Sequence, residues 1–265
     1  MAVETERQVV VEQRGPVAWI KFNRPERRNA IGAQTRAELA AALKQAQKDE
    51  AVRCLVLTGE GTAFCSGADL RDFPAGGSPV EHVGRILRDD YMPMILRMRS
   101  MPKPIIAAVN GVAAGIGVSF AMAADIRIAI EEAAFVEAFV NIGLIPDGGA
   151  TWLLPRLVGA GKALEMCMTG LPLAARDAER LGLVNLVVPA DQLISTVQSF
   201  ADRLAAGPPL AIAAAKRAIN RSLDSTLEEA LEYEANLQQA MAGTADFAEG
   251  VAAFIEKRPA SFTGK

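Results

Sequence analysis

The sequence is poor in aromatic residues and has no strong excess of charge of either sign. Aromatic residues make up 5% of the 265 residues although 51% are hydrophobic, so the apolar content is mainly aliphatic, as in helix-rich α/β proteins. The formal net charge of −3, from 28 basic and 31 acidic residues, provides no general positive field. We therefore expect no nucleic-acid partner, and an anionic ligand would need a local basic site.

Cysteine is also scarce. Cys54, Cys65 and Cys167 are odd in number and lack the paired spacing of metal ligands, so we expect free thiols that pack in a reducing compartment. The first residues show no apolar signal segment. The uncharged stretch 105–124 is rich in alanine and glycine, which favours a buried strand, a tight turn and a buried helix over a membrane span. The resulting prediction is a cytoplasmic protein without membrane contact.

Several common catalytic motifs are missing. There is no Gly-x-Ser-x-Gly nucleophile elbow and no Gly-Lys-Ser/Thr phosphate loop. His82, the single histidine, begins a charged helix, so we interpret it as a surface side chain rather than a base or a metal ligand. Gly115-Ile116-Gly117 resembles the start of a dinucleotide fingerprint, but Phe120 occupies the third glycine position. We predict no metal, and a nicotinamide site is only a weak alternative.

The hydrophobic pattern predicts an α/β chain. Residues 9–22 are typical of a hairpin, 35–48 of a helix with Leu39 and Leu43 on one face, and 54–58 of a buried strand. This strand-helix-strand order predicts a parallel crossover. The other predicted elements are a mobile linker (73–79), a helix kinked at Pro93 (80–99), a second buried strand (105–109), a late strand (183–188) and two long C-terminal helices (226–241 and 245–257).

Two glycine-containing turns each follow a predicted strand and open a helical turn. Gly115 and Gly117 would let a helix N-terminus approach a ligand oxygen, where free N–H groups and the helix dipole stabilise developing negative charge. The turn 64–70 could supply a matching N–H. Close helix packing and capping by Asp69 are the alternative explanations.

Four motifs occur in a fixed order along the chain. They are Asn23-Arg24-Pro25 with Asn29-Ala30, AFCSGADL at 63–70, PKPIIAAVNG at 102–111 and GLIPDGG at 143–149. In order and spacing they resemble the crotonase (enoyl-CoA hydratase/isomerase) superfamily over nearly the whole chain. The resemblance implies an α/β fold with a spiral core of repeated β-β-α units at 1–200 and a helical C-terminal trimerisation domain at 201–265. A homotrimer or homohexamer is implied with it.

The resemblance also implies a substrate. An acyl-CoA thioester would place its carbonyl between the N–H groups of Ala68 and Ile116, with CoA as part of the substrate and no separate cofactor. A net acidic chain needs local bases for the CoA phosphates, and family resemblance favours Arg28, with Arg27 beside it, and Lys257, which could serve a neighbouring subunit. The remaining implied substrate contacts are Ser66, Gly67, Asp69, Gly115 and Leu144.

The expected carboxylates distinguish an isomerase from a hydratase. On the motifs, the two glutamates of the hydratases fall on Ser119 and Phe139, neither of which can activate water. Asp147 matches the catalytic acid of isomerases that resemble the phenylacetate-pathway ring-opening type, although Pro-Asp-Gly by composition alone is an ordinary turn. We predict an enoyl-CoA isomerase in which Asp147 moves the proton. A hydratase that uses another carboxylate and a non-catalytic acyl-CoA-binding protein remain the alternatives.

Three further expectations concern the acidic groups. The apolar neighbours Leu144 and Ile145 should raise the pKa of Asp147. Glu137 is a rival carboxylate in an apolar run, and strand alternation predicts that it faces solvent while its neighbours pack. Asp125 ends a predicted helix and is expected to make structural hydrogen bonds.

Overall fold

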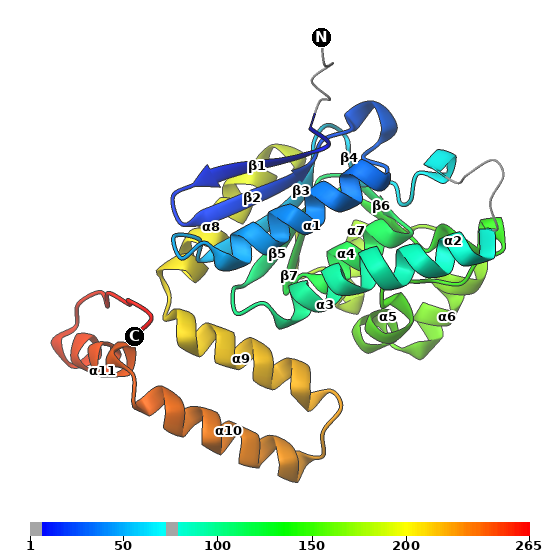
Figure 1. The fold of residues 1–265 in the computed structure, drawn as a ribbon. Helices are drawn as coiled ribbons and strands as arrows, with labels where there is room; N and C mark the ends of the chain where they lie inside the picture. Colours follow the sequence, from blue (N-terminus) through cyan, green and yellow to red (C-terminus); the bar gives the residue numbers. More distant parts are fainter. Residues whose placement is uncertain (1–6, 73–78) are drawn as a thin grey trace.

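The computed structural model describes residues 7–72 and 79–265, so nearly all of the predicted linker lies outside the described residues. The chain forms two β-sheets (Figure 1). The larger sheet has the order β1-β2-β3-β5-β7-β10, in which β1 is antiparallel and the other strands are parallel. Its strands are β1 (Val9–Arg14), β2 (Val17–Phe22), β3 (Cys54–Gly59), β5 (Ile105–Val109), β7 (Ile126–Ile130) and β10 (Leu186–Val188).

The smaller sheet has the order β4-β6-β8-β9, with β9 antiparallel. Its strands are β4 (Ala63–Cys65), β6 (Val112–Ala114), β8 (Ala134–Val136) and β9 (Leu173–Ala174). Each of β3, β5 and β7 in the larger sheet is followed by a partner in the smaller one, and β5 and β6 lead into α4 (Ile116–Ala123). The predicted β-β-α repeat, the hairpin and the parallel crossover are confirmed.

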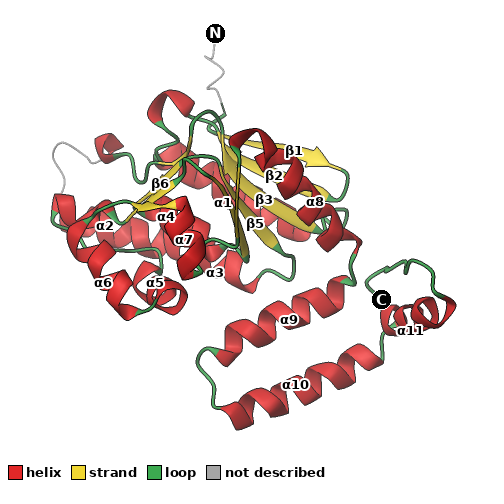
Figure 2. Cartoon of the chain, turned by 180° about the vertical axis from the view of Figure 1, so that it is seen from behind, coloured by secondary structure: helices red, strands yellow, loops and turns green. Residues whose placement is uncertain are grey.

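Helices α1 (Ala33–Lys48) and α8 (Leu193–Ala206) cover opposite faces of the larger sheet, as Figures 1 and 2 show from the two sides. Leu39 and Leu43 of α1 are buried, as their spacing predicts. The indole Nε1 of Trp19 in β2 donates a hydrogen bond of 2.9 Å to Oε1 of Gln198 in α8. The further helices of the core are α5 (Ala150–Val158), α6 (Ala160–Thr169) and α7 (Ala175–Leu181).

The predicted kinked helix is irregular one turn earlier than expected. It consists of α2 (Pro79–Ile86), a π-helical turn (Leu87–Tyr91) and α3 (Met92–Ser100). Pro93 is the second residue of α3, and the π turn ends two residues before it, so the helical run is irregular where the ring and the missing N–H of a proline disturb the preceding turn. The kink at Pro93 itself stays a prediction.

The C-terminal helices α9 (Pro209–Ser222), α10 (Leu227–Ala242) and α11 (Ala245–Glu256) extend away from the core (Figures 1 and 2). Nζ of Lys216 ties α9 to the core, donating to the Met98 and Lys103 carbonyls and, at 2.8 Å, to Oδ2 of Asp125. Asp125 also accepts the Ile105 N–H, which confirms its structural role. The predicted boundary at residue 200 falls inside α8, and the division into two domains stays a prediction.

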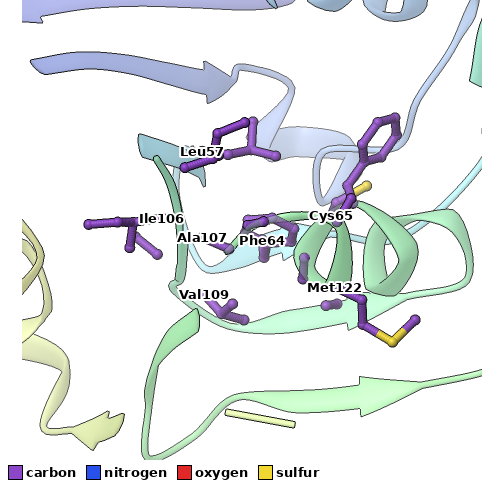
Figure 3. Close-up of a cluster of buried hydrophobic side chains, with 14 of the residues drawn as sticks. Leu57, Phe64, Cys65, Ile106, Ala107, Val109 and Met122 are labelled. Carbon is purple, nitrogen blue, oxygen red and sulfur yellow. The ribbon is translucent and has the colours of Figure 1, made fainter. Parts of the chain in front are cut away.

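The core is aliphatic where the two sheets meet. Figure 3 shows Leu57 of β3 and Ala107 of β5 on the side of Phe64 and Cys65 of β4 and Met122 of α4, whereas Ile106 points to the other side of β5; all of them are buried. The three cysteines are free, as predicted. Stretch 105–124 folds as β5, β6 and α4, so the expected tight turn contains a short strand. Within the described part of the chain, no helix is both long and apolar enough to cross a membrane.

Candidate active site

A cavity of about 250 Å³ lies between the turn after β4, the α2 region, the start of α4 and the segment 138–147. Of the residues predicted to contact substrate, it brings together Ser66, Gly67, Ala68, Asp69, Gly115, Ile116, Leu144 and Asp147. Arg28 and Lys257 do not line it; both are exposed, and Lys257 follows α11. Their contact with the CoA phosphates stays a prediction.

The two glycine-containing turns touch each other. Gly67 and Gly115 have φ of +101° and +52°, which favour glycine, and a Cβ added to Gly67 would lie 3.0 Å from the Ala114 carbonyl oxygen. A Cβ on Gly115 would in turn lie 4.0 Å from Cα of Gly67. This approach places the following residues, Ala68 and Ile116, side by side on the cavity wall.

The N–H groups of Ala68 and Ile116 donate no hydrogen bond to another residue in the described parts of the chain. Ile116 is the first residue of α4, where N–H groups have no intrahelical partner and the helix dipole is positive. Two adjacent free N–H groups of this kind can hold the oxygen of a polarised carbonyl. The free N–H groups support the predicted oxyanion hole, and the role of Ala68 and Ile116 in it stays a prediction.

The loop after β2 holds the turn that follows β4. Ser66 donates its N–H to the Arg28 carbonyl at 2.9 Å and its hydroxyl to the Arg27 carbonyl at 3.2 Å. The carboxylate of Asp69 is buried and pairs with Arg24 and Arg71. The hydrogen bonds from Arg71 lower the pKa of Asp69 to about 2, so this acid is a fixed anion that anchors the turn.

Asp147 lies on a turn that presses against the start of α4. The hydroxyl of Ser119 donates to the Asp147 carbonyl at 2.7 Å, and the Ala150 N–H donates to the same oxygen at 3.0 Å. A Cβ on Gly148, whose φ is +59°, would lie 2.3 Å from Cδ1 of Ile116. These contacts fix Asp147 next to the oxyanion turns.

The carboxyl of Asp147 lacks a partner: Oδ1 is buried and accepts no hydrogen bond within the described structure. Burial raises the pKa of Asp147 to about 6. The predicted direction of this shift agrees, but one predicted cause was wrong, because the Ile145 side chain is 79% exposed. Leu144 does line the cavity, together with Phe139 and Ile116.

Glu137 does not face solvent, so that prediction was wrong. Its side chain is fully buried, and both carboxyl oxygens lack a hydrogen-bond partner within the described residues. Strand β8 ends at Val136 and a 3-10 turn begins at Ala138, so the alternation of a strand does not continue through Glu137. Burial and the charge of Asp147 raise the pKa of Glu137 to about 8.

Sequence reasoning missed several polar side chains of the cavity wall, among them His82, Arg36 and Tyr91. His82 is half-buried and lines the cavity, which corrects its interpretation as a surface residue. Arg36 and Tyr91 lie nearby; Nε of Arg36 pairs with Asp90 at 2.7 Å, and its guanidinium lies 6.0 Å from the Tyr91 ring centre. Arg36 could have been found, because it shares the buried face of α1 with Leu39. No metal-type cluster of His, Cys, Asp or Glu occurs within residues 7–72 and 79–265.

Comparisons with known proteins agree with this geometry. The family model described as enoyl-CoA hydratase/isomerase matches residues 12–265. The chain is 42% identical over 252 residues to the 1,2-epoxyphenylacetyl-CoA isomerase of Escherichia coli, covering 94% of this chain and 95% of that protein. It is 46% identical over 249 residues to a Rhodobacter capsulatus protein named "Probable enoyl-CoA hydratase", with the same two coverages.

Solved structures show the same fold. The structure of an enoyl-CoA hydratase from Bacillus anthracis superimposes with a TM-score of 0.92 at 33% identity, covering 97% of this chain and 100% of that one. One from Geobacillus kaustophilus gives a TM-score of 0.90 at 37% identity, covering 97% and 98%. The arrangement of the two sheets and the C-terminal helices is thus shared along the whole chain.

Proposed function

Because the chain belongs to the enoyl-CoA hydratase/isomerase family and is an enzyme acting on acyl-CoA, we propose that it shifts a double bond rather than adding water. The observation that carries this proposal is Asp147, a carboxyl with a buried, unpartnered oxygen beside the free N–H groups of Ala68 and Ile116. A single acid-base group next to an oxyanion hole is what a proton shift along an acyl chain requires.

The reaction follows from this arrangement. The thioester oxygen accepts hydrogen bonds from the Ala68 and Ile116 N–H groups, which stabilise the negative charge that develops when a neighbouring C–H loses its proton. The carboxylate of Asp147 takes that proton from one end of the C2–C4 system and returns it to the other, while the electron pair passes through the dienolate. The raised pKa of Asp147, about 6, suits a group that must both accept and release a proton near neutral pH.

Hydration is the second candidate, favoured by the name of the Rhodobacter capsulatus relative. It requires a carboxylate that activates water. The two positions predicted for such glutamates hold Ser119, whose hydroxyl is engaged by the Asp147 carbonyl, and Phe139, which is apolar. Glu137 is not among the residues that line the cavity. These contacts favour isomerisation.

The test is Asp147→Asn, assayed with a 3-enoyl-CoA for isomerisation and a 2-enoyl-CoA for hydration. Without the carboxylate, isomerisation should fall by about 100-fold or more, the usual contribution of a positioned acid-base group. Binding of the acyl-CoA, measured by calorimetry, should change little. Asp191→Asn, at an exposed aspartate, is the control and should keep full turnover. Unchanged isomerisation in Asp147→Asn, or hydration as the faster wild-type reaction, would contradict the proposal; binding without either reaction would identify a non-catalytic homologue.

The assembly and the CoA contacts belong to the same proposal. The Arg28 carbonyl accepts the N–H of Ser66, which lines the cavity, and this contact supports Arg28 as a partner for the CoA phosphates outside the cavity. Lys257 follows α11, which Figures 1 and 2 place away from α4, so it would serve a neighbouring subunit of a homotrimer or homohexamer. Location in the cytoplasm stays a prediction of the sequence.

A further inference from the structure

The mechanism above leaves one buried acid without a role. Glu137 is fully buried, and both of its carboxyl oxygens lack a partner among the described residues. Burying an isolated carboxylate costs far more than burying the neutral acid, so Glu137 is held as a carboxylic acid with an O–H to donate. A neutral buried acid that makes no hydrogen bond still costs about 1–3 kcal/mol, so its retention needs a reason.

A matching acceptor adjoins the same part of the fold. The Val136 carbonyl, next to Glu137, accepts the Gly115 N–H at 2.9 Å, and a Cβ on Gly148, next to Asp147, would lie 2.3 Å from Cδ1 of Ile116. Oδ1 of Asp147 is buried and has no partner among the described residues. The negative charge of Asp147 also raises the pKa of Glu137. A donor and an acceptor, each without a partner, are therefore held near the start of α4.

We propose that Glu137 positions Asp147: the neutral acid donates a hydrogen bond across one buried water to Oδ1 of Asp147 and leaves Oδ2 for the substrate. This inference rests on the proposed function of Asp147. The two oxygens of Glu137 and Oδ1 of Asp147 supply the polar partners that a bridging water would need. Glu137 acts through Asp147 and does not itself touch the reacting atoms.

Other charges around Glu137 do not compete for this role. Strands β6 and β9, which flank β8, carry no titratable side chain. On α7, Arg176 pairs with Glu131 and Glu179, and Arg180 pairs with Asp177; on α6, Lys162 pairs with Glu165. Cys167 of α6 is the remaining neighbour, and burial together with Glu137 raises the pKa of its thiol, which stays neutral.

The test is the pH profile of kcat/KM for three proteins: wild type, Glu137→Gln and Glu137→Leu. Wild type should show an acid limb from Asp147 and an alkaline limb where Glu137 ionises and stops donating. Gln keeps a neutral donor of the same shape but cannot ionise, so its neutral-pH activity should stay within about 3-fold and its alkaline limb should disappear. Leu removes the donor to a charged group, so kcat should fall about 10- to 100-fold with little change in KM.

An infrared measurement tests the protonation state without turnover. Near neutral pH, wild type should show the C=O stretching band of a protonated carboxylic acid, and Glu137→Gln should lack it. Absence of this band in wild type overturns the proposal. Thermal unfolding shows whether each variant folds, and the isosteric Gln protein carries the test if the Leu protein does not.

The outcomes separate this inference from the proposed function. If Asp147→Asn keeps isomerising, the function proposed for Asp147 fails, and the positioning role fails with it. If Asp147→Asn is inactive but both Glu137 variants keep the wild-type kcat and both limbs of its profile, Glu137 only fills space and the positioning role alone is overturned.

Discussion

Two carboxyl groups with different protonation states define this site. Burial raises the pKa of Asp147 to about 6 and that of Glu137 to about 8, so between these values Asp147 is ionised while Glu137 is neutral. A pair of acids whose environments separate their pKa values supplies one base and one hydrogen-bond donor from the same residue class. Because the two groups interact, the values describe the pair as much as either residue.

The buried Glu137 should make the stability of the protein depend on pH. Its pKa in the folded state, about 8, lies above the ordinary value of 4.5, so the folded protein binds the extra proton between these values. The contribution of Glu137 to the free energy of unfolding is therefore largest below about pH 4.5 and falls as pH rises towards about 8. Glu137→Gln lacks this loss, and we expect it to be more stable than wild type by about 2–4 kcal/mol at about pH 8.

Urea unfolding of both proteins across this pH range measures that difference. The pKa of Asp147 is also raised in the folded state, but Asp147 is present in both proteins, so its contribution to the pH dependence cancels in the comparison. A difference that stays constant with pH would show that Glu137 does not carry the buried proton.

At the scale of elements, the two oxyanion turns depend on how closely α4 packs on β4. Gly117, in the first turn of α4, would place a Cβ 2.5 Å from the Cys65 carbonyl oxygen and 3.0 Å from its Sγ. A backbone oxygen cannot rotate away as a side chain can. Any residue larger than glycine at position 117 must therefore push α4 away from β4. The N–H groups of Ala68 and Ile116 would then separate.

We expect Gly117→Ala to lose about 1–3 kcal/mol of stability, the usual range for overpacking, and to lower kcat more than acyl-CoA affinity. Gly161→Ala is the matched control, because Gly161 lies in α6 with nothing within 4 Å of its added Cβ, and it should gain up to about 1 kcal/mol. Chemical denaturation and isomerase assays of both variants measure these effects. Equal kcat in Gly117→Ala and wild type would show that the turns tolerate this displacement.

Length explains most of which elements the sequence could predict, although the three-residue β10 was expected within 183–188 and the five-residue β7 was not. The larger sheet contains β3 and β5, runs of five or six buried residues, and α1 shows a helical spacing over 16 residues, so all three were predicted. Strands β4, β6 and β9 have two or three residues each, too few for any hydrophobic period, and were missed.

The same limit explains the site residues. Asp147 and the two glycine turns were predicted because motifs mark them, whereas the burial of Glu137 depends on where β8 stops. His82 lines the cavity because α2 packs over that cavity. This is a tertiary contact, which no local sequence pattern predicts. The Lys216 to Asp125 pair is of the same kind, since it joins residues 91 positions apart.

For the whole molecule, the C-terminal helices expose several large apolar side chains. Phe254 and Ile255 on α11 are 86% and 72% exposed, and Leu227 on α10 is 76% exposed. A groove of about 660 Å³ between α9, α10 and α11 is lined by further apolar side chains, among them Leu237 and Phe247. Exposed apolar surface of this kind is typical of contacts with another protein chain, and it supports the proposed homotrimer or homohexamer.

Assembly should therefore depend on α11, and substrate affinity should depend on assembly. We expect a native mass of three or six times 28.1 kDa by light scattering, and a shift towards the single-chain mass in the double variant Phe254→Glu, Ile255→Glu, because two buried, unpaired charges oppose association. Val11→Glu, on an exposed position of β1, is the control and should keep the assembly.

If Lys257 serves the neighbouring subunit, the dissociated protein should also show a higher KM for acyl-CoA, as should Lys257→Ala in the intact assembly. A wild type of single-chain mass would contradict the proposed assembly, and an unchanged KM in Lys257→Ala would remove the role of Lys257 while leaving the assembly in place.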